Sequence, residues 1–226
     1  MRRIIYFLTA CFILSSCGMF STVTRETQYA KMYEEKPVTL LVMPPINNST
    51  NVEAKEFLYT SISRPLAEAG YYVISPLLAM DVFKSESAYD AENFFNGPLN
   101  EFNKYFGADA VVFSIIDTWA KKGMGIETKI RYVIKSTYTN EILFDRSCDL
   151  YLDLTLESDS KKGGLFDVLV DLAASAINTA ATDHIVAARK ANYYIFRDIP
   201  RGKYDPDFMN DKDLIAEDKD VVTVVR

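Results

Sequence analysis

The stretch that decides the fold is residues 126–154, which read IETKIRYVIKSTYTNEILFDRSCDLYLDL. Apolar and polar side chains alternate over residues 126–136, and again over residues 142–154. A period of two is typical of a β-strand with one buried and one solvated face. Asn140 tolerates the left-handed conformation that closes a three-residue loop. The stretch therefore predicts an antiparallel hairpin of two long strands.

The loop also predicts which residues of the two strands face each other. If Thr137 pairs with Glu141, a single register follows for the whole hairpin. Its apolar face then sets opposite each other the pairs Ile134 and Phe144, Ile130 and Cys148, and Ile126 and Leu152. A slip by one residue would set apolar against charged positions throughout, so the parity is well specified.

The other face of the hairpin carries charges. The register sets Lys129 opposite Asp149. It places Arg131 diagonal to Asp145 and to the same Asp149. Exposed cross-strand charge pairs contribute only about 0.2–1 kcal/mol each, so stability needs this face little. We therefore predict that it is free to serve as a contact face for a partner.

Upstream of the hairpin, strands and helices alternate. Short apolar runs at residues 38–43, 71–74 and 110–116 predict strands, the last of them central. Three helices are predicted between them. One is capped by Thr50, places Leu58, Ile62 and Leu66 on one stripe, and ends at Gly70. Pro65 lies inside this helix and is expected to kink or break it.

The second helix begins at Pro76, with Leu77, Met80 and Phe83 facing inward, and the third spans residues 99–106. After the hairpin, an alanine-rich helix is predicted over residues 165–191. This order predicts an α/β (α+β) fold, in which helices flank a mixed β-sheet with a C-terminal antiparallel hairpin.

The start of the chain carries an export signal. Arg2 and Arg3 precede an uncharged apolar run over residues 4–14, which is shorter than the roughly 20 residues that span a bilayer. Residues 14–17 read LSSC, which is a lipobox: an apolar residue and two small ones before the cysteine that receives the lipid. We therefore expect residues 1–16 to be removed and Cys17 to be lipidated.

The residue after the cysteine bears on location. Gly18 stands where an aspartate would resemble the signal that retains lipoproteins in the inner membrane. Several acyl chains hold a protein stably on a bilayer, whereas one does not. We therefore expect a lipid-anchored outer-membrane protein that faces the periplasm.

The rest of the chain is predicted to hold one domain. Residues 17–36 are interpreted as a lipidated tether, residues 37–200 as a single α/β domain, and residues 201–226 as an acidic C-terminal tail. Cleavage would remove Arg2 and Arg3, so the 25 basic residues become 23 against 31 acidic ones, a net charge of −8. An acidic chain is a poor ligand for nucleic acid, because phosphate binding needs a basic face.

Two internal motifs carry a resemblance to known proteins. Residues 41–48 read LVMPPINN and residues 65–73 read PLAEAGYYV, and IPRGKY follows at residues 199–204. With the lipobox, they resemble a family of bacterial lipoproteins of unknown function that includes a neisserial antigen. The resemblance implies a fold similar to the N-terminal domain of TolB, and a partner lipoprotein resembling the curli-secretion pore CsgG. It implies no catalytic residue.

Candidate catalytic groups are few. The lone histidine, His184, has neither a metal-ligand cluster nor a Gly-x-Ser-x-Gly elbow in the sequence, which favours a structural role over that of a general base. Asp145, Asp149 and Asp153 recur along one strand about 13 Å apart, wider than the about 5–9.5 Å between glycosidase carboxylates. We therefore expect no enzyme, cofactor or metal site.

Two residues of the second hairpin strand need separate interpretation. Cys148 shares the apolar parity and is interpreted as a small buried residue. Arg146 breaks that parity, which leaves two readings: a residue at the rim of the core, or the partner of a carboxylate such as Asp117.

The loop Asn47, Asn48, Ser49 and Thr50 offers an alternative site. It joins the end of a strand to the start of a helix, where free backbone N–H groups bind anions. It lacks the glycines and the lysine of a P-loop, and its residue types also suit capping and turn formation.

Two functions remain open on this sequence. One is a non-enzymatic interaction or accessory module of an envelope assembly, such as a CsgG-like secretion pore. The alternative is an envelope hydrolase or small-anion-binding protein that uses the Asn47–Thr50 loop.

Overall fold

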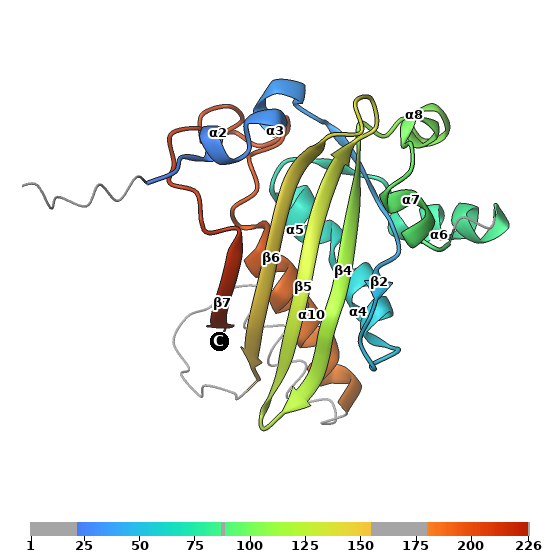
Figure 1. The fold of residues 1–226 in the computed structure, drawn as a ribbon, viewed down its shortest axis with the longest axis vertical. Coiled ribbons are helices and arrows are strands. Elements are labelled where there is room, and N and C mark those ends of the chain that lie inside the picture. The colour runs from blue at the N-terminus through green and yellow to red at the C-terminus, as the bar shows by residue number, and fades with distance from the viewer. Residues whose placement is uncertain (1–21, 87–88, 155–179, 226) are drawn as a thin grey trace, which may run out of the picture.

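The computed structural model describes residues 22–86, 89–154 and 180–225. A mixed sheet of seven strands runs in the order β3-β1-β4-β5-β6-β7, with β2 beside β4, so the predicted helix-flanked mixed sheet is confirmed (Figure 1). The strands are β1 (Thr39–Val42), β2 (Ile46–Asn47), β3 (Tyr72–Val73), β4 (Ala110–Lys122), β5 (Gly125–Ser136), β6 (Ile142–Asp153) and β7 (Asp220–Val225).

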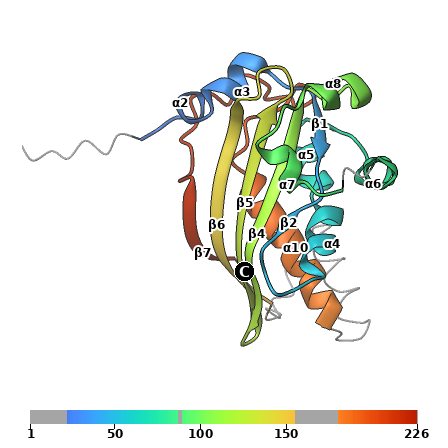
Figure 2. The same ribbon diagram turned by 45° about the vertical axis from the view of Figure 1, so that its right-hand side comes forward.

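Helices pack on both faces of this sheet. The helices are α2 (Arg25–Gln28), α3 (Ala30–Glu35), α4 (Ala54–Ser61), α5 (Ser63–Glu68), α6 (Pro76–Ser85), α7 (Glu92–Phe95), α8 (Asn100–Phe106) and α10 (Ala180–Phe196). Figure 2 shows α4 and α10 together on one side of the sheet, where they bury the main core with α2, α3 and α5. A second, smaller core lies between β1, β4 and the helices α6 to α8.

The hairpin forms with the predicted register. Ile126 pairs with Leu152, Ile130 with Cys148, and Ile134 with Phe144, and all six side chains are buried. Asn140 takes the predicted left-handed conformation, with φ of 62°.

The last rung of the hairpin departs from the prediction. The register shifts by one residue after Ile134, and the Ser136 N–H donates to the Glu141 carbonyl at 2.9 Å. Thr137 instead donates its N–H to the Asp109 carbonyl, so the predicted pairing of Thr137 with Glu141 is wrong. The Ser136 hydroxyl accepts from the N–H of Tyr138, which folds the loop one residue wider.

The first predicted helix is broken in two. Leu58, Ile62 and Leu66 are buried as expected, but α4 ends before Ile62 and α5 starts after it, with Pro65 inside the first turn of α5. The predicted cap is wrong: the Asn51 side-chain oxygen, not that of Thr50, accepts from the first helical N–H of α4 at 3.0 Å.

The second predicted helix forms as α6, but the side of it that is buried differs from the prediction. Leu77 is 74 % exposed, whereas Ala79, Met80 and Phe83 are buried. At 100° per residue, position 77 lies about 110° from the centre of the stripe formed by residues 79, 80 and 83, on the flank of α6. The inward position predicted for Leu77 is therefore wrong.

Both ends of the predicted domain extend further than expected. From Arg25 onward the predicted tether is folded, because α2 and α3 bury Tyr29, Met32 and Tyr33 against the sheet. The predicted acidic tail also packs, since Asp211 is buried and β7 pairs in parallel with β6. Tyr29, Met32 and Tyr33 have helical spacing, but the polar composition of the residues around them obscures this signal in the sequence.

The alanine-rich helix is described only in part. Residues 155–179 lie outside the described residues, and α10 continues beyond the predicted end at Ala191 as far as Phe196. Ala187, Ala188 and Ala191 are fully buried, which fits the close packing expected of alanine. Within the described ranges, no helix has the length and apolar character needed to cross a membrane.

Candidate functional site

One face of the sheet is open over β5, β6 and β7. Figure 1 looks onto this face, and none of the described helices crosses in front of these three strands. Lys129 is exposed on it, and Arg131, Asp145 and Asp149 are half-buried. We refer to this surface as the open face; it carries the four residues predicted as a contact face.

An arginine–carboxylate pair lies at the centre of the open face. The Arg131 guanidinium donates from Nε to Asp145 Oδ1 at 2.8 Å and from Nη2 to Asp145 Oδ2 at 2.6 Å. This bidentate bond raises the pKa of Arg131, and Asp220 and Asp117 contribute further attraction from a distance. Acidic groups therefore surround Arg131 on the open face.

The valines of β7 continue the open face to the edge of the sheet. Val222 lies beside Asp149 and is 83 % exposed, and Val224 lies beside Tyr151 and is 54 % exposed. In the described part of the chain β7 pairs only with β6, so its outer edge presents unpaired backbone groups. An apolar, unpaired edge next to a charged face is a feature that natural sheets usually avoid unless something covers it.

The Asn47–Thr50 loop uses its polar atoms internally. Asn47 donates from Nδ2 to the Asn51 carbonyl at 2.8 Å, and its Oδ1 accepts from both the N–H and the hydroxyl of Ser49. Asn48 donates to the carboxylate of Asp117 at 3.1 Å, which places a negative charge beside the loop. Thr50 is exposed. This geometry fits a turn better than a cradle for an anion.

His184 is held as a packing residue. Its Nδ1 accepts from the Trp119 indole N–H at 2.8 Å, and its ring stacks on Phe57 with centroids 5.8 Å apart. The neighbouring Asp183 pairs with Lys121 at 3.1 Å. This arrangement commits the Nδ1 lone pair to Trp119, so that atom is not available to take a proton from a substrate.

Cys148 is a buried thiol, as predicted. Burial raises its pKa to about 11, because the desolvated thiolate is disfavoured. The thiol is therefore protonated at neutral pH and chemically quiet. Among the described residues, no cluster of three or more histidine, cysteine or acidic side chains is arranged to hold a metal ion.

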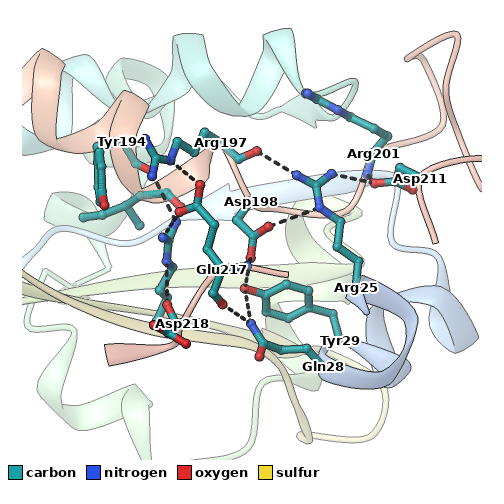
Figure 3. Close-up of polar contacts among 12 residues, drawn as sticks. Arg25, Gln28, Tyr29, Tyr194, Arg197, Asp198, Arg201, Asp211, Glu217 and Asp218 are labelled. Atoms are coloured by element: carbon teal, nitrogen blue, oxygen red, sulfur yellow. Dashed lines mark hydrogen bonds and ion pairs between the residues drawn. The ribbon is translucent and has the colours of Figure 1, made fainter. Parts of the chain in front are cut away.

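A buried polar cluster joins both ends of the folded chain (Figure 3). Arg25, 8 % exposed, pairs with Asp198 at 3.2 Å and with Asp211 at 3.0 Å, and donates to the Arg197 carbonyl. Tyr29 donates its hydroxyl to Asp198 at 2.7 Å. Burial and the bond to this carboxylate raise the pKa of Tyr29 well above its usual value. We name this group, together with the pair Arg146 and Glu217, the end cluster.

Arg146 belongs to the same region rather than to the rim of the core or to Asp117. Its side chain is fully buried, and it pairs with Glu217 from the C-terminal segment. It also donates to the carbonyl of Ile195 at 2.7 Å, at the C-terminal end of α10. A cation there satisfies carbonyls that have no partner within the helix, which explains a charge at an apolar parity position.

Two of the three resemblance motifs, residues 65–73 and 199–204, meet at this end of the molecule. Gly202 donates its N–H to the Ala69 carbonyl at 2.8 Å, and Tyr71 donates its hydroxyl to the Pro200 carbonyl at 2.6 Å. A β-carbon on Gly202 would lie 2.4 Å from the carbonyl oxygen of Gly70. Gly70 itself has φ of 88°. The glycines of both motifs therefore serve one close backbone contact.

Sequence reasoning missed the end cluster. Arg25, Asp198, Asp211 and Glu217 all lie in segments whose composition is polar. The available signal was Arg146, a charge at a core-facing position of β6, which required a buried partner somewhere in the fold.

Comparison with known proteins places the chain in a family. The sequence matches the family described as "Putative lipoprotein GNA1162-like" over residues 27–198. A lipoprotein of Neisseria meningitidis serogroup B is 24 % identical over 194 residues, which cover 86 % of this chain and 89 % of that protein.

Two solved structures align with part of the chain. The crystal structure of lipoprotein GNA1162 from Neisseria meningitidis aligns with a TM-score of 0.46 and 23 % identity, over 64 % of this chain and 99 % of that one. The C-terminal domain of LpoB from Salmonella enterica aligns with a TM-score of 0.34 and 16 % identity, over 55 % of this chain and 93 % of that one.

Proposed function

The chain belongs to the GNA1162-like family of lipoproteins, and from this premise we propose that it is an outer-membrane-anchored, periplasmic interaction module without enzymatic activity. Cys17 is the anchor, and the open face with its β7 edge is the surface that binds an envelope protein. The partner implied by the family resemblance is a lipoprotein similar to the CsgG pore.

The lipobox supports the anchor at Cys17. A Cys17→Ser variant is expected to lose labelling by a fatty-acid analogue and to accumulate as precursor or as soluble protein, because serine offers no thiol to the lipid transferase. Normal acyl labelling of this variant would show that the anchor is elsewhere.

The variant Gly18→Asp tests the location. Membrane fractionation should then find the lipidated protein in the inner membrane.

One observation supports the open face as the surface that binds a partner. Val222 and Val224 are exposed on a free strand edge, directly beside the charges of the open face. Protein interfaces combine a desolvated apolar centre with a polar rim, and β-strand edges accept a further strand from a partner. The open face offers both, because the valines supply the apolar part and Lys129, Arg131 and Asp149 supply the rim.

The test is partner capture in intact cells. A photoreactive amino acid at Val222 should cross-link a defined envelope protein, and Lys129→Glu with Arg131→Glu should weaken that capture by reversing the charge of the rim. Lys84→Glu with Lys104→Glu is the matched control, because it changes the net charge equally on α6 and α8.

The control variant should unfold at the same urea concentration as the wild type. Lys129→Glu with Arg131→Glu should stay folded and lose only about 1 kcal/mol, because it removes the part-exposed Arg131–Asp145 pair. Equal capture by wild type and a well-folded Lys129→Glu, Arg131→Glu variant would move the interface away from the open face. The Asn47–Thr50 loop would then be the next surface to test, first as a protein contact and then with inorganic phosphate as a probe for anion binding.

A further inference from the structure

Three large apolar side chains are exposed where the described chain begins. Val23 is 41 % exposed, Leu214 54 % and Ile215 65 %. Val23 and residues 214–215 come from segments far apart in the sequence that run side by side. The Ala216 N–H donates to the Val23 carbonyl, and Thr24 forms an antiparallel bridge with Ile215. We name Val23, Leu214 and Ile215 the anchor-side patch.

The anchor-side patch is fixed to the folded domain. The Arg25 N–H donates to the Leu214 carbonyl at 2.9 Å, and the Arg25 side chain pairs with the buried Asp198 and Asp211. The Glu26 N–H donates to the Lys212 carbonyl at 3.1 Å. Because the end cluster holds both segments, the patch cannot swing away from the domain as a loose tail would.

The sequence places the patch close to the lipid anchor. Val23 follows Cys17 by six residues. Six residues span at most about 22 Å even when fully extended. A Cys17 that carries acyl chains in the bilayer therefore keeps Val23 within that distance of the membrane surface.

We infer that the anchor-side patch rests in the interface of the membrane that holds Cys17, an inference that rests on the proposed lipid anchor. The occupant of the patch is an uncharged or zwitterionic lipid surface. Apolar side chains at such a position enter the boundary between headgroups and acyl chains. Lys212 is paired with Glu26 at 2.7 Å and Asp213 is exposed, so the described residues next to the patch form no basic cluster of the kind that selects anionic lipids.

The domain also has a surface far from the patch. Figure 1 shows α2 and α3 at one end of the molecule and the turn between β4 and β5 at the other. That turn includes Met124, which is 70 % exposed and lies at the end of the molecule remote from α2. Position 124 therefore serves as a control site that the membrane contact does not reach.

The test uses the full-length, lipidated protein in vesicles of phosphatidylcholine and phosphatidylethanolamine. An environment-sensitive dye is attached to Ile215→Cys in one sample and to Met124→Cys in the matched control, while the buried Cys148 stays unlabelled. Lipids that carry a quencher near the headgroup are then added. We expect loss of fluorescence and a blue shift at position 215, and neither change at position 124.

A second variant separates insertion from mere proximity. With the dye at Val23→Cys, the changes Leu214→Ser and Ile215→Ser should reduce quenching while vesicle flotation stays complete. Protein that floats but shows no quenching at position 215, or equal quenching at 215 and 124, would refute the contact between the patch and the lipid. It would leave the lipid anchor at Cys17 unaffected. Unquenched protein that cross-links from position 215 to another protein in cells would assign the patch to that protein instead.

Failure of the lipid anchor gives a distinct result. Full-length protein that does not float with vesicles would refute lipidation at Cys17, and the membrane contact of the patch would fall with it.

Discussion

The end cluster and the open face each contain an arginine–aspartate pair, which is buried in the end cluster and partly exposed on the open face. In the end cluster, Arg25 and Asp198 have side chains 9 % and 1 % exposed. On the open face, Arg131 and Asp145 have side chains 42 % and 30 % exposed. Both are arginine–aspartate pairs, yet the first links α2 to the segment after α10, whereas the second links two neighbouring strands. Burial, not residue type, separates a structural clamp from a surface available to a partner.

Desolvation is the physical reason for this difference. An exposed ion pair exchanges contacts with water for contacts with its partner, so its net contribution is only about 0–1 kcal/mol. A buried charge cannot return to water when its partner is removed, and deletion of one partner costs about 3–5 kcal/mol. Removing the aspartate of the buried pair should therefore lower the free energy of unfolding far more than removing the aspartate of the exposed pair.

The largest effect is expected from Asp198→Ala. The carboxylate accepts from Arg25, from the Tyr29 hydroxyl and from the Glu217 N–H at 3.0 Å. Its loss leaves a buried guanidinium with Asp211 as its remaining carboxylate, so the free energy of unfolding should fall by about 3–5 kcal/mol in urea titrations. A loss below about 1 kcal/mol would mean that the end cluster behaves like a surface pair.

Cys148 offers an independent readout of the same variant. Its thiol is fully buried and its pKa is raised to about 11, so reagents reach it only when the fold opens. Because each 1.4 kcal/mol changes the open population tenfold, a loss of about 3–5 kcal/mol in Asp198→Ala should speed labelling at pH 8 by about 100- to 4,000-fold. Asp145→Ala is the control, and its labelling rate should change by less than about tenfold.

A smaller effect is expected from Gly202→Ala. The new methyl group would lie 2.4 Å from the Gly70 carbonyl oxygen and 2.7 Å from the carbon of that carbonyl, so the C-terminal segment must shift. Overpacking of this kind lowers the free energy of unfolding by about 1–3 kcal/mol. Lys203→Ala, at the next and exposed position, should have no comparable effect in the same thermal and urea measurements.

Asp145→Ala should cost less still. Its pair with Arg131 is bidentate but part-exposed, which gives an expected loss of up to about 1 kcal/mol in urea at low salt. The loss should shrink in 1 M NaCl, because the screening length falls to about 3 Å. A salt-independent loss of several kcal/mol would show that the open face is covered in solution.

The smallest effect is expected from Asp149→Asn. Asp149 lies opposite the exposed Lys129 and beside the exposed Val222. Substitutions at such positions usually change the free energy of unfolding by no more than about 0.5 kcal/mol. If partner capture nevertheless falls, the side chain acts in binding and not in folding, which is the role proposed for the open face.

Local patterns in the sequence determined the sheet and the main stripe of its helices. The period of two in residues 126–154 fixed the parity of the hairpin, and the structure pairs Ile130 with Cys148 as predicted. The spacing of Leu58, Ile62 and Leu66 likewise placed three buried side chains on one stripe. Such predictions succeed because burial of one face imposes a period that neighbouring residues must share.

Only the tertiary structure decided how the ends of the chain are used. The segments around Arg25 and Asp211 have the polar composition of tethers, yet both pack on the domain. Tyr29 and Met32 are buried in the main core, and Arg25 pairs with Asp211 across the molecule. Nothing near Arg146 in the sequence indicates that Glu217 is its partner, and nothing near Gly70 indicates the approach of Gly202. Charge pairing and close backbone contact depend on distance in space and on the loss of water, and neither quantity is written in the local order of residues.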